Sequence, residues 1–198
     1  MQISAEKTAN LGGAVAENFW TLPNGITLVR ILLTPLLFAL PWHHGRWWSG
    51  VIALAFLLVS LTDVLDGYLA RSYGQETRIG KLLDPLADKL LVMTALFMLV
   101  AVGRIPPWAL PLVVVILGRE FAVTGLRGIA GTQGVVIGAS GLGKWKAGFQ
   151  IAALTALLIH WPLLSLPAHE IGLVLLVIAT ALSSISGYAY MRDYFQHS

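Results

Sequence analysis

The sequence contains no cysteine and little charge. With no cysteine among its 198 residues, the chain has no disulfide bond and no thiolate chemistry. Charged residues make up only 12% of it and hydrophobic residues 57%, which is too little charge to cover a soluble surface. It also lacks a basic stripe with interleaved aromatic residues, so we expect no nucleic-acid partner despite the net charge of +3. These absences favour a protein whose solvent is a lipid bilayer.

Long apolar stretches predict an all-α, polytopic integral membrane protein with about six transmembrane helices of ~20 residues each. The predicted spans cover residues 26–42, 48–70, 82–102, 108–130, 145–164 and 171–191. Residues 1–21 are small and polar and lack the basic start and cleavage pattern of a signal peptide. We therefore predict an N-terminal cytosolic segment over 1–21, lying at the membrane surface, and a single membrane domain over 22–198.

The basic residues beside the predicted spans are distributed unequally between the two sides. Only Arg46 and Arg104 fall on one side. The other side, which carries both termini, has Lys7, Arg30, Arg71, Arg78, Lys81, Arg127, Lys144, Lys146 and Arg192. Because short cytosolic loops carry the excess of Lys and Arg, the side with both termini is predicted to face the cytosol. The positive net charge suits an anionic leaflet.

A cluster of acidic and small residues lies near the predicted cytosolic ends of the second and third spans. Its members are Asp63, Asp66, Gly67, Ala70, Arg71, Gly80, Asp84 and Asp88. On a helix the first five fall within an arc of about 140°, and the last three drift by only about 40° per step. Residues 72–79 lack apolar periodicity and are predicted to form a turn, so two helices joined there would bring both acidic faces together.

Four carboxylates near hydrocarbon indicate a bound cation, because an uncompensated charge there is strongly unfavourable. No cysteine or histidine lies between Asp63 and Asp88, and an all-oxygen ligand set suits a hard cation such as Mg²⁺ or Mn²⁺. Gly67 and Ala70 leave space beside the carboxylates for a bulky ligand group. Arg71 would then meet a phosphate or another anion.

The spacing D-x2-D-G-x2-A-R-x8-G-x3-D-x3-D resembles the signature of the CDP-alcohol phosphotransferase family of integral membrane enzymes at all eight specified positions. Three further runs resemble the branch of that family that makes phosphatidylglycerophosphate: residues 23–30, 119–127 and 143–146. Together the similarity covers roughly residues 22–150. The resemblance implies transfer of a phosphatidyl group from CDP-diacylglycerol to sn-glycerol 3-phosphate, with release of CMP.

The resemblance also implies roles for individual residues. Two metal ions, Mg²⁺ or Mn²⁺, would be held by Asp63, Asp66, Asp84 and Asp88. Asp88 would also be the general base. The CDP-lipid would be bound by Asp66, Gly67, Ala70, Arg71 and Gly80. The acceptor phosphate would be bound by Arg119, Arg127, Lys144 and Lys146. A homodimer in the bacterial cytoplasmic membrane is implied, with the active site facing the cytosol.

Several alternatives stay open at this point. Arg119 and Glu120 inside an apolar segment could simply pair with each other, and Lys144 and Lys146 could be positive-inside anchors. Ala147 stands where relatives often have threonine, so that hydroxyl contact to the acceptor is absent here. Sister branches that use inositol phosphate, serine or phosphatidylglycerol keep the same eight residues. Outside the family, a divalent-cation transporter would also place carboxylates in spans, and prenyl-diphosphate chemistry would require a second acidic motif.

Overall fold

The structure is a computed structural model that describes residues 22–39, 45–73, 78–132, 141–163 and 165–197. Within these ranges, the side chains of residues 22–24, 36–39, 63–73, 78–82, 84, 132 and 197 lie outside the description. The predicted N-terminal segment over 1–21 falls outside the described residues.

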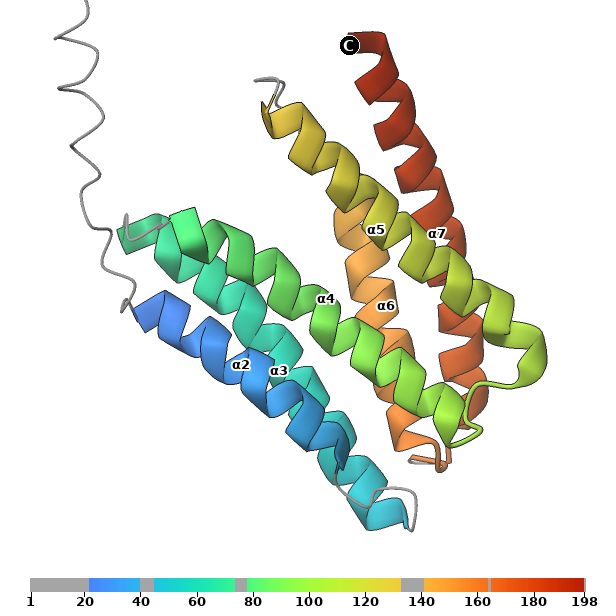
Figure 1. Cartoon of the computed structure of the whole chain (residues 1–198). Coiled ribbons are helices and arrows are strands. Elements are labelled where there is room, and N and C mark those ends of the chain that lie inside the picture. Colours follow the sequence, from blue (N-terminus) through green and yellow to red (C-terminus); the bar gives the residue numbers. More distant parts are fainter. Residues whose placement is uncertain (1–21, 40–44, 74–77, 133–140, 164, 198) are drawn as a thin grey trace, which may run out of the picture.

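Six long helices make up nearly all of the described chain. They are α2 (Leu22–Ala39), α3 (Arg46–Tyr73), α4 (Arg78–Ala101), α5 (Leu110–Thr132), α6 (Gly141–Ile159) and α7 (Ala168–His197), with a 3₁₀ turn, η2 (Pro107–Ala109), before α5. Helices that follow one another in the chain run in alternating directions, with α2, α3 and α4 grouped on one side and α5, α6 and α7 on the other (Figure 1). The described residues form no strand, since Leu163 and Leu166 make only an isolated bridge. The predicted all-α fold class is confirmed.

The helix boundaries differ from the predicted spans at several points, one of which is the end of α6. The prediction carried that helix to residue 164, but it ends at Ile159. His160 adopts a positive φ of 61° and donates its backbone N–H to the Ala156 carbonyl oxygen, 3.0 Å away. A left-handed residue closes a helix in this way, and Pro162 follows two residues later. Hydropathy alone could not detect this stop.

Three other helix boundaries also differ. The helix α3 extends to Tyr73 and α4 begins at Arg78, so the turn predicted over 72–79 is shorter than expected. The last helix runs to His197 instead of 191. Its final turns carry charged residues, including Arg192, whose Nη2 pairs with Asp193 Oδ1 at 3.0 Å. A helix can continue in polar residues after its apolar stretch ends, because the backbone hydrogen bonds persist in water.

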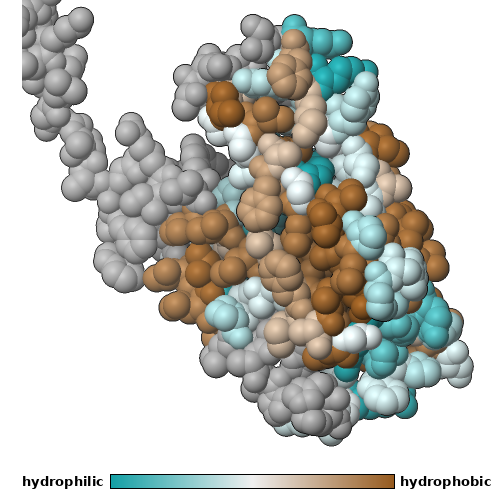
Figure 2. All heavy atoms as spheres, turned by 45° about the vertical axis from the view of Figure 1, so that its right-hand side comes forward, coloured by the Kyte–Doolittle hydropathy of each residue, from teal (hydrophilic) through white to brown (hydrophobic). Residues whose placement is uncertain are grey.

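Much of the outer surface is apolar. Trp47, Val114, Trp145 and Phe195 each expose at least two thirds of their surface, and hydrophobic side chains cover much of one face of the molecule (Figure 2). Two helices in the described chain are long and apolar enough to cross a membrane: Pro107–Gly131 and Ala168–Gln196. Shorter apolar stretches occupy Gly25–Pro35 and Arg46–Thr62. Such a surface is better matched to lipid than to water.

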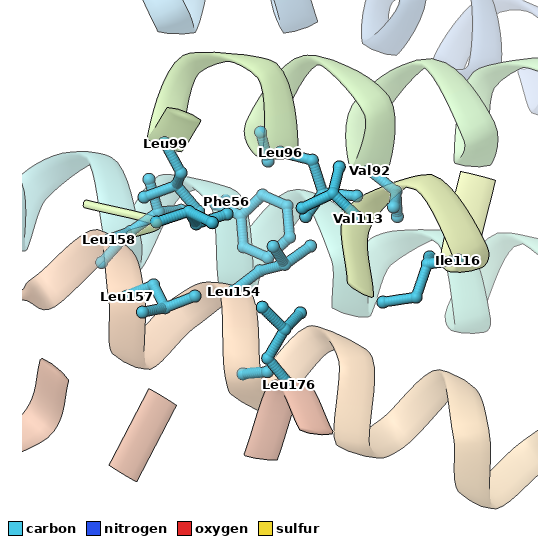
Figure 3. Packing of buried hydrophobic residues seen from close by; sticks show 14 of the residues in the cluster. Phe56, Val92, Leu96, Leu99, Val113, Ile116, Leu154, Leu157, Leu158 and Leu176 are labelled. Carbon is cyan, nitrogen blue, oxygen red and sulfur yellow. The ribbon is translucent and has the colours of Figure 1, made fainter. Parts of the chain in front are cut away.

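The buried core joins the two groups of helices. Phe56 of α3 is fully buried, and its ring lies among Leu96 of α4, Val113 of α5 and Leu154 of α6 (Figure 3). Leu176 adds a contribution from α7. Five helices therefore share one apolar cluster, which holds the walls of any cavity between them in place.

Two glycines allow α7 to approach its neighbours closely. A Cβ atom on Gly172 would lie 2.8 Å from Cγ of Leu157 in α6 and 3.0 Å from the Leu157 backbone nitrogen. A Cβ atom on Gly187 would lie 2.8 Å from Cγ of Arg119 in α5. Real Cβ atoms do not come this close to other atoms, so larger residues at either position would push the helices apart.

Hydrogen bonds from two arginines stabilise the end of the molecule that carries the start of α3 and the end of α4. Arg104 follows α4 and is only 6% exposed. Its Nη1 donates to the Leu158 carbonyl oxygen at 2.6 Å, and its Nη2 donates to Ser49 Oγ at 2.6 Å. Arg46 Nη2 donates to the Pro162 carbonyl oxygen at 2.8 Å. The arginines thus connect α3 and α4 to the end of α6.

Candidate functional site

A cavity that opens to the surface lies between α4, α5 and α6. Its polar lining comes from all three helices: Asp88 and Lys89 from α4, Glu120 from α5, and Lys146 and Gln150 from α6. The remaining lining residues are Val92, Met93, Leu117, Phe121, Ala147 and Ile151. A concave apolar site with a few converging polar groups is the usual form of a small-molecule site.

Glu120 is the centre of the polar contacts in this cavity. Its Oε1 accepts hydrogen bonds from Lys146 Nζ and, at 3.1 Å, from Arg119 Nη1. The side chains of Arg119, Glu120 and Lys146 are 15%, 17% and 9% exposed, so all three charges are largely withdrawn from solvent. One carboxylate therefore compensates two cations, and the three groups together keep a charge of +1 available to an anion.

Arg119 is further held by α7. Its Nη2 donates to Ser186 Oγ at 2.9 Å, and Ser186 Oγ in turn donates to the Ser183 carbonyl oxygen at 3.1 Å. The side chain also packs against Gly187, which has no Cβ atom to displace it. Arg119 is thus directed toward α7 and does not line the cavity, whereas Lys146 does.

The other two residues predicted to bind the acceptor phosphate lie elsewhere. Arg127 is exposed on α5, and its guanidinium carbon lies 5.4 Å from the centre of the Tyr190 ring, as in a cation–π contact. Lys144 is exposed near the start of α6 and does not line the cavity. Of the four predicted residues, Lys146 lines the cavity, and Arg119 contacts the lining residue Glu120 from behind. Their roles toward an acceptor stay predictions.

The aspartate cluster is described in its backbone and, for Asp88, in its side chain. Residues 63–73 are helical in α3 and residues 78–88 are helical in α4, so the i, i+3 and i, i+4 spacings hold in the structure. Asp88 is exposed and lines the cavity. The described side chains contain no group of three or more acidic, histidine or cysteine residues around a common point. The side chains of the other members lie outside that description: Asp63, Asp66, Gly67, Ala70, Arg71, Gly80 and Asp84.

The chemistry of this donor set fits a divalent hard cation. It supplies four carboxylates and neither sulfur nor imidazole, which is the ligand type that Mg²⁺ and Mn²⁺ prefer. Asp88 belongs to both groups, because it is one of the four predicted metal ligands and also lines the cavity that contains Lys146.

Two residues of the site have no counterpart among the predicted functional residues. Glu120 was expected at most to pair with Arg119, and its contact with Lys146 joins residues 26 positions apart on different helices. Gln150 is a single polar residue in an apolar stretch of α6 and belongs to none of the motifs found in the sequence. A hint was available for it: Lys146 and Gln150 are four residues apart and therefore share a helix face.

A family model described as "CDP-alcohol phosphatidyltransferase" matches residues 20–185. A protein of Bacillus subtilis (strain 168), named CDP-diacylglycerol–glycerol-3-phosphate 3-phosphatidyltransferase, is 42% identical over 86% of this chain and 93% of its own length. A protein of the same name from Cereibacter sphaeroides is 32% identical over 87% of this chain and 95% of its length. A rice protein named cardiolipin synthase (CMP-forming) is 35% identical over 87% of this chain and 56% of its own length.

The shared carboxylate predicts an unequal response to two substitutions. Glu120→Gln leaves Arg119 and Lys146 facing each other without their common anion, whereas Lys146→Met leaves Glu120 still paired with Arg119. We expect Glu120→Gln to lower the free energy of unfolding by roughly 3 to 5 kcal/mol, and Lys146→Met to lower it by about 1 kcal/mol. Thermal unfolding of the purified variants in detergent measures the difference.

The exposed neighbour Lys144 provides a matched control for this comparison. Lys144→Met should change the free energy of unfolding by less than about 0.5 kcal/mol. If Lys146→Met proved as destabilising as Glu120→Gln, the carboxylate would not be the group that both cations depend on.

Proposed function

Because the chain belongs to the CDP-alcohol phosphatidyltransferase family, we propose that it is a phosphatidyltransferase that transfers a phosphatidyl group from CDP-diacylglycerol to sn-glycerol 3-phosphate. The family resemblance predicted from the eight-residue signature is thereby confirmed. The choice of acceptor is supported by the names of the relatives from Bacillus subtilis and Cereibacter sphaeroides. In the structure, the observation that carries the proposal is the cavity that contains the Asp88 carboxylate and the Lys146 ammonium group.

The reaction requires one bond to form and one to break at phosphorus. The primary hydroxyl oxygen of glycerol 3-phosphate attacks the phosphorus atom that carries the diacylglycerol group. The bond from this phosphorus to the CMP oxygen breaks, and CMP leaves with the bonding electrons. The products are phosphatidylglycerophosphate and CMP, and the proton of the attacking hydroxyl passes to a base.

Lys146 is the proposed contact for the acceptor phosphate. It lines the cavity and is only 7% exposed, so its charge acts in a setting with little water to screen it. Glu120 fixes the ammonium group from one side and is itself shared with Arg119. The incoming phosphate meets a positioned cation, and the net positive charge of the three groups attracts it. Arg119, Arg127 and Lys144 are proposed as additional positive charges near this end of α5 and α6.

Asp88 is the proposed general base. Its carboxylate lines the same cavity as Lys146, from the facing helix α4. A base opposite the phosphate contact lies on the correct side to take the proton of a hydroxyl at the other end of a short acceptor. Both groups are exposed to the one cavity that an acceptor would fill.

The nucleotide end of the donor is proposed to bind at the aspartate cluster. Asp63, Asp66, Asp84 and Asp88 would hold two Mg²⁺ or Mn²⁺ ions, which supply positive charge for the diphosphate and for the leaving CMP. The CDP portion would be bound by Asp66, Gly67, Ala70, Arg71 and Gly80. The helical spacing of α3 and α4 and the all-carboxylate composition support this assignment.

We further propose that all six helices span the bacterial cytoplasmic membrane with the aspartate cluster facing the cytosol. The alternating helix directions and the apolar outer surface support it, as does the excess of basic residues on the side with both termini. CDP-linked lipids would then be used on the side where cytidine nucleotides occur. The homodimer that the family resemblance implies stays a prediction.

The proposed function is tested by the release of CMP from CDP-diacylglycerol. Purified protein in detergent with Mg²⁺ should release CMP with sn-glycerol 3-phosphate, because that acceptor carries both the phosphate and the attacking hydroxyl. Free glycerol is the control, since it lacks the phosphate that Lys146 would bind. A higher rate with inositol phosphate, serine or phosphatidylglycerol would retain the family activity and refute the acceptor. Failure to release CMP with any acceptor would refute the activity, and movement of divalent cations across vesicles would then point to a transporter.

The carboxylate cluster predicts that activity depends on a divalent cation. After bound metal is stripped with EDTA, CMP release should fall to background, because four carboxylates without a cation repel the diphosphate. Addition of Mg²⁺ or Mn²⁺ should restore it. Full turnover in excess EDTA after stripping would contradict the proposed metal site.

The role of Asp88 predicts a loss in turnover larger than any loss in donor binding. Asp88→Asn should lower kcat by at least ~10², because a positioned proton acceptor contributes roughly 10² to 10⁴-fold. Binding of CDP-diacylglycerol, measured by titration in the presence of Mg²⁺, should persist through the remaining aspartates. Near-normal kcat in this variant at neutral pH would place the base at another residue.

A further inference from the structure

Gln150 is a buried amide in the wall of the cavity. It lies on α6 one turn after Lys146, is 3% exposed, and lines the same cavity as Asp88 and Lys146. Its Oε1 is buried and has no hydrogen-bond partner in the described part of the chain. A buried polar atom without a partner is unfavourable, so such a group in a cavity wall indicates a ligand that satisfies it.

The other polar groups around the cavity are already engaged or assigned. Glu120 is shared by Lys146 and Arg119. Lys89 Nζ donates to the Pro85 carbonyl oxygen at 3.1 Å. Ala147 presents only a methyl group, so no side-chain hydroxyl contacts a ligand from that position. Gln150 is the neutral polar side chain of this lining.

The proposed acceptor has one polar group that these contacts leave without a partner. In glycerol 3-phosphate the phosphate would meet Lys146 and the attacking primary hydroxyl would meet Asp88. The secondary hydroxyl at C2 lies between these ends. Lys146 and Gln150 are separated by one helical turn, about 6 Å along the axis, which matches the scale of the distance from the phosphate to the C2 hydroxyl. A hydroxyl both donates and accepts, so it suits either end of an amide.

We propose that Gln150 determines acceptor specificity by hydrogen bonding to the non-reacting C2 hydroxyl of glycerol 3-phosphate. This inference rests on the proposed function and adds to it a specific contact. A site with a buried hydrogen-bonding group discriminates against an analogue that lacks the matching hydroxyl, because the analogue leaves the group unpaired. Gln150 thus acts on the choice between acceptors and takes no part in bond formation.

The test compares two acceptors that differ by one hydroxyl. Glycerol 3-phosphate and 3-hydroxypropyl phosphate both carry a phosphate and a primary hydroxyl, but the second lacks the C2 hydroxyl. For the purified full-length protein, kcat/KM from CMP release at saturating CDP-diacylglycerol should be about 10 to 100 times higher with glycerol 3-phosphate. Gln150→Met keeps the length of the side chain and removes the amide, so it should reduce this ratio to roughly 1. The reduction should come from glycerol 3-phosphate alone.

Two further variants separate specificity from a structural effect. Ile151→Val alters an apolar lining residue and should change both acceptors equally, which leaves the ratio as in the wild type. Gln150→Asn keeps an amide on a shorter side chain and should retain part of the preference, so it tests the same contact if Gln150→Met does not fold.

Two results would overturn the role of Gln150 and leave the proposed function intact. One is an equal kcat/KM for both acceptors in the wild type. The other is a ratio of the two kcat/KM values that stays unchanged in Gln150→Met and Gln150→Asn. An equal loss with both acceptors in the Gln150 variants would also overturn it, since that is the mark of a purely structural residue. A wild-type protein that releases CMP with neither acceptor would instead refute the proposed function, and this inference would fall with it.

Discussion

The Glu120 carboxylate, shared by Lys146 and Arg119, is the interaction on which the rest of the site depends. Charges in a setting with little water must be compensated, and here one anion compensates two cations from different helices. Glu120 therefore joins α5 to α6 directly and, through Arg119 and Ser186, to α7. The same contact that holds the three helices together also fixes the position of Lys146 in the cavity wall.

Much of the fold, and the lining residues Asp88 and Lys146 of the candidate site, could be predicted from the sequence, because both leave local patterns. Apolar stretches located six helices, and the aspartate spacing located Asp88. The end of α6 could not be predicted, since it depends on the backbone conformation of His160 within an apolar run. The contact between Glu120 and Lys146 depends on helix packing over 26 residues of sequence. The role of Gln150 could not be predicted because it depends on the burial of its amide group. Burial is determined by how the helices pack and leaves no pattern in the sequence.

The distribution of polar and apolar side chains is the reverse of that in a water-soluble protein. Large apolar side chains such as Trp47 and Val114 face outward, while Lys146, Gln150 and Arg104 are buried. Buried hydroxyl groups such as those of Thr34 and Thr180 donate to carbonyl oxygens one turn earlier, so their burial leaves no unsatisfied donor. Most buried polar groups of the described chain have a partner or belong to a residue that lines the cavity. Ser183 Oγ and Arg119 Nε are the exceptions, because both are buried without a hydrogen-bond partner and neither residue lines the cavity.

The two close approaches of α7 have a mechanical consequence. The helix touches α6 at Gly172 and α5 at Gly187, two points fifteen residues apart, or about 22 Å along the axis. A rod held at a single point can still pivot and twist, but one held at two points against two different supports cannot. Helix α7 therefore restrains α5 and α6 and prevents them from sliding past each other. The alignment of Glu120 with Lys146 is thus maintained by two positions that have no side chain.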